Sequence, residues 1–371
     1  MATVPFRLPA ERNEPNLSSP KRSGVEAALK RLRSNLPLQS DIYFNGKVQA
    51  ASNLEPQVLP AEHQTVFTHY PLASEDQGAT AIESALDAKK KWENTPFVDR
   101  VAIFQKAAEL VTERYRNDLI AATMLGQGKN IWQAEIDAAA ELTDFFRLNC
   151  NYAAELLGRQ PSQLAVATEC GPHRRVEYSP LGGFVYAVSP FNFTALGGSL
   201  VSGPALMGNV VTEAVLAHRE FAGISFIGSS DVLRPIHAKV GEGIGARRYR
   251  EFPRVVGETS GKNFHLIHPS ADIPSAGQKC SATSRVHIPQ SRADEFLGLL
   301  KSSIGKITIG SPDKDPDAFM GPVIHGHAFT KIKSIIDKIE SPDLDLFNTE
   351  IFGPVLSAYV YPDGKWSYPS N

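Results

Sequence analysis

Short apolar runs alternate with helical patterns through the second half of the chain, and this alternation constrains the fold most strongly. Each apolar run has the length and residue types of a buried strand, and the stretches between them have helical spacing. The expected elements are, in order, Phe184–Val188, a helix over Ala195–Met207, Asn209–Val211, Ile224–Ile227, a helix over Val232–Val240, Arg254–Val256 and Phe264–Ile267. Strands that alternate with helices form parallel sheets covered on both faces. The sequence therefore predicts a doubly wound α/β domain.

A second, smaller α/β unit is expected after the first. Strands are predicted at Arg285–Ile288 and Val355–Val360, with helices at Ala293–Ile304 and Ala328–Ile339. At the other end of the chain, residues 1–23 are rich in Pro, Ser and Asn, which is typical of a poorly ordered arm. A chain of 371 residues is also long for one hydrophobic core. We therefore expect an arm over residues 1–23 and two domains, residues 24–262 and 263–371.

Three local patterns in the N-terminal half also predict structure. Asn45 and Gly46 between two apolar runs predict a hairpin turn. Ser74 followed by Gln77 predicts a capping box at the start of a helix that runs through Trp92. One long helix is expected over Ile131–Leu157, where it stops at Gly158.

The composition argues against several kinds of partner. A net charge of −2 disfavours nucleic acid or an anionic membrane surface as the main partner. No apolar run reaches the length of a membrane span. The three cysteines, Cys150, Cys170 and Cys280, form an odd set without the spacing of a metal site, which favours a reducing compartment and indicates no metal.

Cys280 is the residue that points most clearly to chemistry. Lys279 precedes it and small residues follow it, a setting typical of an accessible, activated thiolate. Glu258 lies in a glycine-containing turn after an apolar strand, and Asn192 follows the strand expected at Phe184–Val188. A thiol, a carboxylate and a carboxamide at three strand ends can act as nucleophile, general base and oxyanion donor.

Each of these residues also has an ordinary structural interpretation. Cys280 alone would more often be a half-buried structural cysteine, and Glu258 would be a solvated carboxylate. Asn192 would cap the helix that follows it, and a capping side chain could not also face a substrate. The functional interpretation is favoured because Glu258 lies at a strand end, where ligands bind in α/β sheets, and because of the longer runs in which the three residues occur.

Longer stretches around these residues resemble the NAD-dependent aldehyde dehydrogenases, and within them the branch of the delta-1-pyrroline-5-carboxylate dehydrogenases, also called glutamate-γ-semialdehyde dehydrogenases. The resemblance runs from about Leu36 to Asp363, through the runs around Glu258 and Cys280 and through Gly126–Asn130, Ala134–Leu142, Ser189–Ala195 and Thr349–Val355. It implies an α/β fold of the aldehyde dehydrogenase type. A doubly wound parallel sheet would form the NAD-binding domain (residues 24–262), and a second α/β domain (residues 263–371) would be catalytic, both of them incomplete.

The resemblance implies a covalent mechanism. The Cys280 thiolate would attack the aldehyde, the Asn192 amide and the Cys280 backbone N–H would hold the oxyanion, and Glu258 would activate water to release the acid. NAD is the implied cofactor, with contacts from Ser189, Gly228, Ser229, Glu350 and Phe352, and the aldehyde would meet Phe193, Lys279, Ser281 and Glu141. Taken alone, Gly228 and Ser229 form an ordinary strand-to-helix turn, and Glu141 is a solvated helix residue.

The reaction that the resemblance implies is the oxidation of L-glutamate 5-semialdehyde to L-glutamate, the second step of proline catabolism. It also implies a homo-oligomer, a small-molecule substrate rather than nucleic acid or membrane, and the mitochondrial matrix. The N-terminus itself carries a weak targeting pattern, so the cytoplasm stays open as the alternative location.

The resemblance is interrupted at four places. It skips a segment after Val211, others near Ile273 and Phe347, and everything past about Asp363, whereas the flanking sequence matches without drift. Such abrupt joins are typical of skipped exons or misplaced introns. The lost segments would include the lysine that holds the adenosine ribose, a helix before Cys280, the substrate-carboxylate anchor and the oligomerisation strand.

These interruptions lower the activity that we expect. The chain as written is expected to bind NAD poorly and to be inactive. Two alternatives to the leading interpretation stay open: an aldehyde dehydrogenase of another substrate, and a catalytically inactive truncated or mis-spliced remnant.

Overall fold

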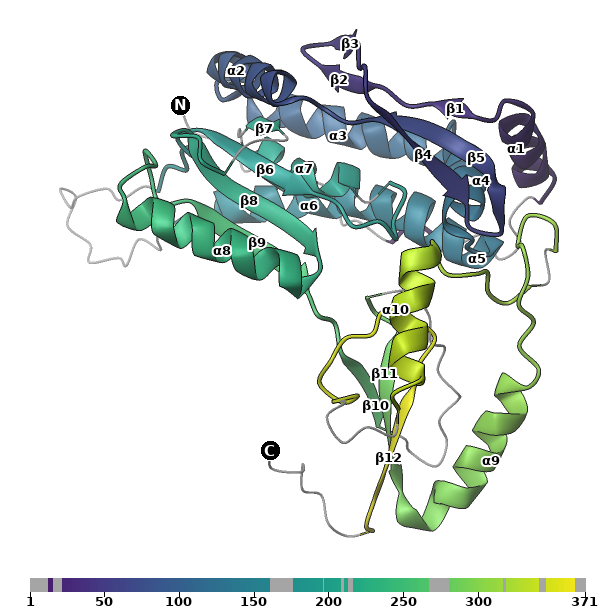
Figure 1. Ribbon diagram of the computed structural model, residues 1–371. Coiled ribbons are helices and arrows are strands. Elements are labelled where there is room, and N and C mark those ends of the chain that lie inside the picture. Colours follow the sequence, from purple (N-terminus) through teal and green to yellow (C-terminus); the bar gives the residue numbers. More distant parts are fainter. Residues whose placement is uncertain are drawn as a thin grey trace. The chain divides into compact units, whose positions relative to one another are not determined.

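The computed structural model describes residues 13–15, 22–160, 176–195, 197–207, 210–212, 216–266, 280–315, 318–339 and 345–363 (Figure 1). The chain divides into two compact units. The first holds the described residues of Met1–Gln57, Val66–Thr123 and Ile131–Gly257, and the second holds those of Val58–Thr65, Met124–Asn130 and Glu258–Asn371. The second unit therefore combines the C-terminal part of the chain with two short stretches from its N-terminal half.

A four-stranded sheet forms the centre of the first unit. Its order is β7 (Val210–Thr212), β6 (Phe184–Val188), β8 (Phe221–Gly228) and β9 (Arg254–Thr259). β6 is parallel to both β7 and β8. Helix α7 (Gly197–Leu206) follows β6 and helix α8 (Ser230–Gly245) follows β8, and Figure 1 shows them on opposite faces of the sheet. The predicted doubly wound arrangement is confirmed, with β7 and β9 as the outer strands among the described residues.

The core of this sheet is built from aromatic and branched side chains. Phe184, Phe221, Ile224 and Phe226 of β6 and β8 form one cluster with Leu233 and Val240 of α8 and with Ile82 of helix α2 (Glu75–Trp92). α2 begins at the predicted capping box, in which the Ser74 hydroxyl accepts from the Gln77 N–H and the Gln77 side chain accepts from the Ser74 N–H. Burial of these side chains, rather than local propensity, fixes the positions of the strand ends.

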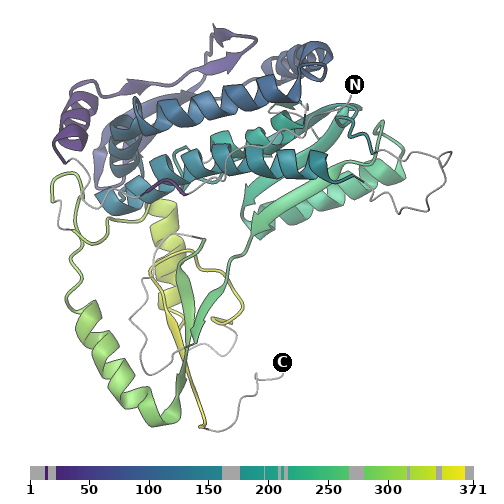
Figure 2. The same ribbon diagram turned by 180° about the vertical axis from the view of Figure 1, so that it is seen from behind.

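A helical layer packs beside the sheet. Helices α3 (Phe97–Thr112) and α6 (Glu141–Gly158) lie side by side in both views (Figures 1 and 2). Their contacts are apolar. Val101, Cys150 and Ala153 form one cluster with Leu206 of α7, and Ala108, Val111, Leu142 and Phe146 form another. Cys150 is fully buried here, so it packs as a small apolar side chain.

The segment before α6 differs from the single long helix expected over residues 131–157. After helix α4 (Arg116–Gln127), the short helix α5 (Ile131–Ala134) leads into a π-helical turn at Glu135–Ala140, and α6 begins only then. An isolated π-turn inside an α-helix is rare and is not signalled by apolar spacing. The wider turn brings Glu135 and Asp137 into the interior, where they are 0% and 1% exposed.

Glu14 links the beginning of the chain to this helical layer. Its carboxylate pairs with Arg116 at 2.8 Å and with Arg147 at 2.7 Å, and its backbone N–H donates to Asp144. Arg116 in turn donates from Nε to the buried Glu135 at 3.0 Å. Residues 13–15 lie within the stretch that was expected to be a poorly ordered arm. They are bound to the helical layer through Glu14, and the composition of the stretch does not indicate these contacts.

The remaining elements of the N-terminal half form small sheets. Helix α1 (Arg22–Ser34) precedes a three-stranded sheet of order β1 (Leu38–Gln39), β5 (Glu62–Pro71) and β4 (Leu54–Leu59). A separate hairpin joins β2 (Ile42–Phe44) to β3 (Lys47–Gln49). Asn45 and Gly46 at its tip have φ values of 53° and 69°, the left-handed conformation that a two-residue hairpin turn requires. The predicted hairpin is confirmed.

The second unit is built on a parallel sheet of three strands. β11 (Thr283–Pro289) lies between β10 (Asn263–Leu266) and β12 (Ser357–Tyr361). A single turn of 3₁₀-helix (Gln290–Arg292) leads into helix α9 (Ala293–Ile304), and helix α10 (Gly326–Ile336) follows. Val286 and Ile288 of β11 pack with Ala293, Phe296 and Leu300.

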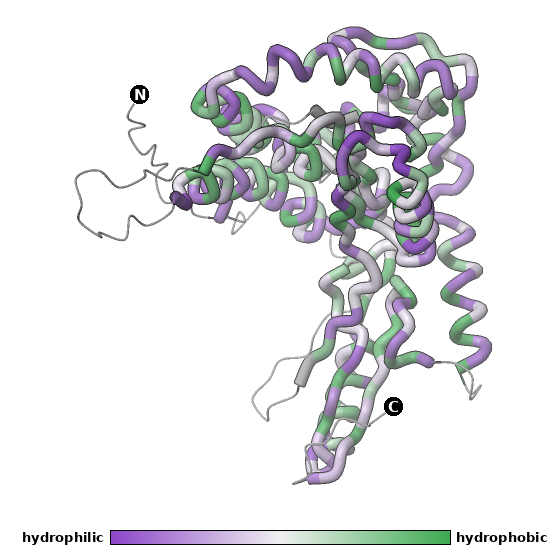
Figure 3. Tube along the Cα trace, turned by 90° about the vertical axis from the view of Figure 1, so that its left-hand side faces the viewer, coloured by the Kyte–Doolittle hydropathy of each residue, from purple (hydrophilic) through white to green (hydrophobic). Residues whose placement is uncertain are grey.

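Several of the longer helices in both units are amphipathic. Figure 3 shows hydrophilic and hydrophobic residues interleaved along them. None of the helices within the described ranges is long and apolar enough to cross a membrane.

Candidate active site

The thiol loop of Cys280 is anchored by the turn that joins β9 to β10. Asn263 donates from its side-chain amide to the Cys280 carbonyl at 2.7 Å and to the Ala282 carbonyl at 3.5 Å. Gly261 lies against the same carbonyl, since a Cβ on this glycine would come within 2.7 Å of the Cys280 oxygen. Cys280 is half-buried, in contrast to the fully buried Cys150. Cys280, the accessible one of these two cysteines, therefore lies three residues before β11, and its carbonyl contacts the segment that follows Glu258.

The turn from Glu258 to Asn263 has an unusual backbone. Glu258 and Thr259 end β9, and Ser260 then adopts a φ of 57°, in the left-handed region that non-glycine residues rarely occupy. Gly261 and Asn263, which follow this residue, both approach the Cys280 carbonyl. Glu258 itself is exposed, so water reaches its carboxylate.

A second carboxylate, Glu350, lies against the same turn. It accepts a hydrogen bond from the Gly261 N–H, and burial raises its pKa, with the charge of Glu258 adding to the increase. Phe352, two residues later, has a φ of 57°. Both residues line a pocket that opens to solvent, together with Gly261, Lys262, Ala282, Thr283, Ser284, Ile351, Gly353 and Val355.

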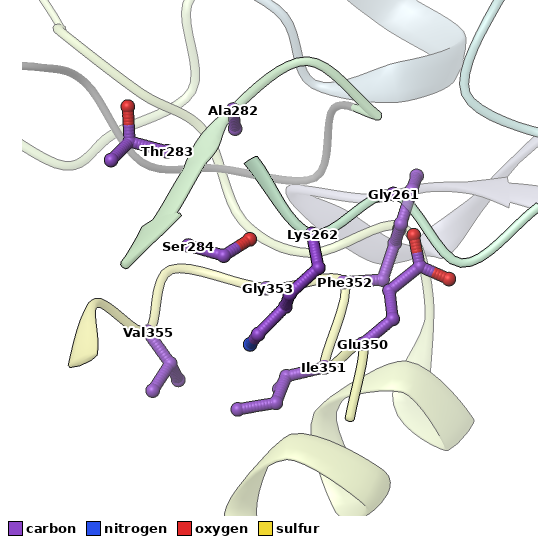
Figure 4. A pocket seen from close by; sticks show the side chains of 10 residues that line it. All are labelled: Gly261, Lys262, Ala282, Thr283, Ser284, Glu350, Ile351, Phe352, Gly353 and Val355. Carbon is purple, nitrogen blue, oxygen red and sulfur yellow. The ribbon is translucent and has the colours of Figure 1, made fainter. Parts of the chain in front are cut away.

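Lys262 brings a positive charge to this pocket. Figure 4 shows its side chain pointing away from the Glu350 carboxylate. Burial lowers the pKa of the Lys262 amine, and the nearby charge of Arg285 lowers it further. Arg285 also donates to the Lys262 carbonyl at 2.9 Å, which ties the turn to β11.

The predicted oxyanion donor, Asn192, belongs to the first unit. It lies in the turn after β6 and is 4% exposed, and its neighbour Phe193 is 6% exposed. Helix α7 begins at Gly197, so Asn192 is too far along the chain to be its N-cap. This removes the ordinary interpretation of Asn192 as a cap. Cys280 and Glu258 belong to the second unit, on segments that meet through Gly261 and Asn263, whereas Asn192 belongs to the first unit.

Three of the predicted cofactor residues also lie in the first unit, at strand ends. Ser189 follows β6, and its hydroxyl packs so closely on Gly197 that a Cβ there would come within 2.3 Å. Gly228 ends β8, and Ser229 caps α8 by accepting from the Asp231 N–H at 3.2 Å. The start of this 16-residue helix suits a phosphate, because it is the positive end of the helix dipole.

The predicted substrate residues are more scattered. Ser281 is exposed beside Cys280, and Glu141 is the half-buried first residue of α6. Lys279 lies outside the described residues. The sequence did not single out Gly261, Lys262 and Asn263 as site residues, although they directly follow Glu258 in the same run. A glycine in a strand-end turn was the available signal, since such a position often marks a close approach of backbone.

The comparisons with known proteins agree with one another. The model of the aldehyde dehydrogenase family matches residues 48–212 and 200–341. The delta-1-pyrroline-5-carboxylate dehydrogenase of Emericella nidulans, described as mitochondrial, is 41% identical over 442 residues, covering 96% of this chain and 76% of that protein. The Homo sapiens enzyme of the same name is 34% identical over 438 residues, covering 95% of this chain and 76% of that protein.

Among solved structures, the delta-pyrroline-5-carboxylate dehydrogenase of Mycobacterium tuberculosis bound with NAD superposes with a TM-score of 0.86 at 31% identity, covering 98% of this chain and 81% of that one. This match confirms the predicted fold type. The alignment with the Emericella nidulans relative is longer than the chain itself, 442 positions against 371 residues, so internal segments of that relative have no counterpart here. The chain belongs to the aldehyde dehydrogenase family.

Proposed function

We propose that this chain carries the active site for the NAD-dependent oxidation of L-glutamate 5-semialdehyde to L-glutamate, the second step of proline catabolism. The names of the relatives at 34–41% identity support this substrate, and the NAD-bound structure of the Mycobacterium tuberculosis enzyme supports the cofactor. The observation that carries the proposal is the contact between the Cys280 loop and the turn that bears Glu258.

The reaction begins with the Cys280 thiolate. Its sulfur adds to the aldehyde carbon and forms a thiohemiacetal. This addition is needed because the planar aldehyde carbon can release hydride only after it has become tetrahedral. We assign the Asn192 side-chain amide and the Cys280 backbone N–H to the oxygen that becomes negative in this step. Bound NAD would supply the hydride acceptor for this carbon. A thioester then remains on Cys280.

Glu258 completes the cycle. Its exposed carboxylate takes a proton from water as that water attacks the thioester carbonyl, the carbon–sulfur bond breaks, and the Cys280 thiolate is restored with release of the acid. Glu258 and Cys280 are on segments that contact each other through Gly261 and Asn263, so the base and the thioester are held by one connected part of the chain.

The residues present fit NAD at two points. The start of α8, with Gly228 and Ser229, offers amide N–H groups to the pyrophosphate. Glu350, beside Phe352, offers a half-buried carboxylate that can accept hydrogen bonds from ribose hydroxyls. We assign Ser189 to the nicotinamide end. Phe193, Ser281, Glu141 and Lys279 are assigned to the substrate.

The missing segments are expected to lower both the NAD affinity and the turnover rate of this chain. β7 is an outer strand of the described sheet, and internal segments of the Emericella nidulans relative have no counterpart in this chain. We therefore expect the printed chain to bind NAD weakly and to turn over slowly. We also propose a mitochondrial matrix location, as in the relatives described as mitochondrial, and a homo-oligomer in forms that retain all segments.

The test compares two proteins, the printed chain and a version in which the internal segments are restored from the Emericella nidulans relative. NADH formation is measured with L-glutamate 5-semialdehyde and with an unrelated aliphatic aldehyde. We expect the restored protein to oxidise the semialdehyde with clear preference. Equal rates with both aldehydes would assign the site to another substrate, and no NADH with either would refute the proposed activity.

A further inference from the structure

The backbone carbonyl of Cys280 is held from two sides. The Asn263 amide donates to it at 2.7 Å, and Gly261 leaves room for this contact because it has no Cβ. The same amide reaches the Ala282 carbonyl at 3.5 Å, so one side chain spans the loop that begins with the nucleophile. The contact is partly buried, which protects it from competition with water.

The strand pairing explains why Asn263 reaches this loop. β10 pairs with β11 from Asn263 opposite Thr283, but the register shifts between Asn263 and Phe264, and Phe264 lies opposite Arg285. A shift of this kind disrupts the backbone ladder locally and redirects the side chain beside it. At this point the Asn263 side chain, rather than a regular backbone pair, connects β10 to the residues before β11.

The contact bears on the reactivity of the thiol. The Cys280 carbonyl oxygen carries partial negative charge, and a donor bonded to it reduces its repulsion of a thiolate on the same residue. The bond also fixes the peptide after Cys280 and with it the direction of the thiol. A displacement of 1 Å at a reacting centre can cost about a hundredfold in rate.

We propose that Asn263 is a positioning residue for Cys280, which holds the thiol loop against the Glu258 turn and favours the thiolate. This inference rests on the proposed function, in which Cys280 is the nucleophile. Asn263 touches neither substrate nor cofactor in this account and acts through the Cys280 carbonyl.

The test uses the full printed chain and does not depend on turnover. Alkylation of Cys280 by iodoacetamide is followed as a function of pH, and the modified residue is located by peptide mass spectrometry. Asn263→Asp keeps the shape but replaces the donor with a carboxylate. Asn263→Ser shortens the side chain so that it no longer reaches the Cys280 carbonyl, and it adds no charge. Asn130→Asp is the matched control, since Asn130 donates to the Phe319 carbonyl at 2.6 Å in the same unit.

We expect Asn263→Asp and Asn263→Ser to slow alkylation at neutral pH by about tenfold and to shift its midpoint to higher pH. The rates should converge with that of the unchanged protein once the thiol is fully ionised. Asn130→Asp should lower thermal stability without moving the alkylation profile. If Asn263→Asp does not fold, the serine variant supplies the same comparison.

The outcomes separate this inference from the function beneath it. A Cys280 that reacts quickly in the unchanged chain and equally quickly in both Asn263 variants would overturn the positioning role and leave the nucleophile in place. A Cys280 that reacts no faster than free cysteine in the unchanged chain would contradict its assignment as nucleophile and the inference with it.

Discussion

Glu350 accepts a hydrogen bond from the backbone N–H of Gly261, and this bond joins the proposed ribose carboxylate to the turn that also holds Cys280. The Glu350 carboxylate is partly buried and lies near the charge of Glu258. The short turn after Glu258 therefore contacts both the Glu350 carboxylate and the Cys280 loop.

The raised pKa of Glu350 predicts a pH-dependent stability. Since its pKa is raised in the folded protein above the ordinary value of 4.5, its contribution to stability is complete below that value and is lost as pH rises through the folded pKa. Glu350→Gln keeps an acceptor for the Gly261 N–H and removes the charge. We expect this variant to melt at a higher temperature than the unchanged chain at pH 7 and at the same temperature near pH 4. A constant difference across this range would show that burial does not penalise the Glu350 charge.

The ion pairs of Arg116 are predicted to matter for stability far more than those of Arg31. Arg116 connects Glu14 to the fully buried Glu135, whereas Arg31 pairs with Asp118 at an exposed site. Arg116→Ala leaves a buried charge without its partner and should cost about 3–5 kcal/mol. Arg31→Ala should cost at most about 1 kcal/mol. Urea denaturation of both variants measures the difference, and equal costs would mean that Glu135 is stabilised by other groups.

The two cysteines that the structure describes should differ sharply in function. Cys280→Ala in the segment-restored protein should abolish NADH formation while leaving NAD binding unchanged, because the thiol forms the covalent bond and the cofactor contacts lie elsewhere. Cys150→Ala should retain activity and lose some stability, since Cys150 fills space between α3 and α6. Turnover close to that of the unchanged protein in Cys280→Ala would end the thiolate mechanism.

NAD affinity should separate the printed chain from the restored one. We expect the absent segments to include the charged partner of the adenosine ribose. The loss of that hydrogen bond, worth about 1.5–3 kcal/mol, should weaken binding by about tenfold or more. Calorimetric titration with NAD measures this directly. Equal affinities in the two proteins would show that the absent segments contribute nothing to the cofactor site.

The sequence predicted those features that depend on local pattern. The strand Phe184–Val188 has the predicted bounds, and the Asn45–Gly46 turn and the Ser74–Gln77 capping box form as expected. These succeed because apolar alternation, turn residues and caps act over a few positions.

Features that join distant residues were not predictable in this way. The Asn263 contact depends on a register shift between two strands, and the Glu14 ion pairs join residues more than a hundred positions apart. The π-helical turn at Glu135–Ala140 accommodates buried charges that no apolar spacing records. In each case tertiary packing decides between local arrangements that the sequence alone leaves equally plausible.

The central claim is that Cys280 carries the acyl group and Glu258 releases it, and one measurement tests both. Glu258→Gln in the segment-restored protein is mixed with NAD and L-glutamate 5-semialdehyde, the reaction is quenched in acid, and the peptides are examined by mass spectrometry. We predict a burst of one NADH per active site and the acyl group on the Cys280 peptide, because the thioester forms but water is poorly activated. A burst without an adduct, or an adduct on any other residue, would contradict the account.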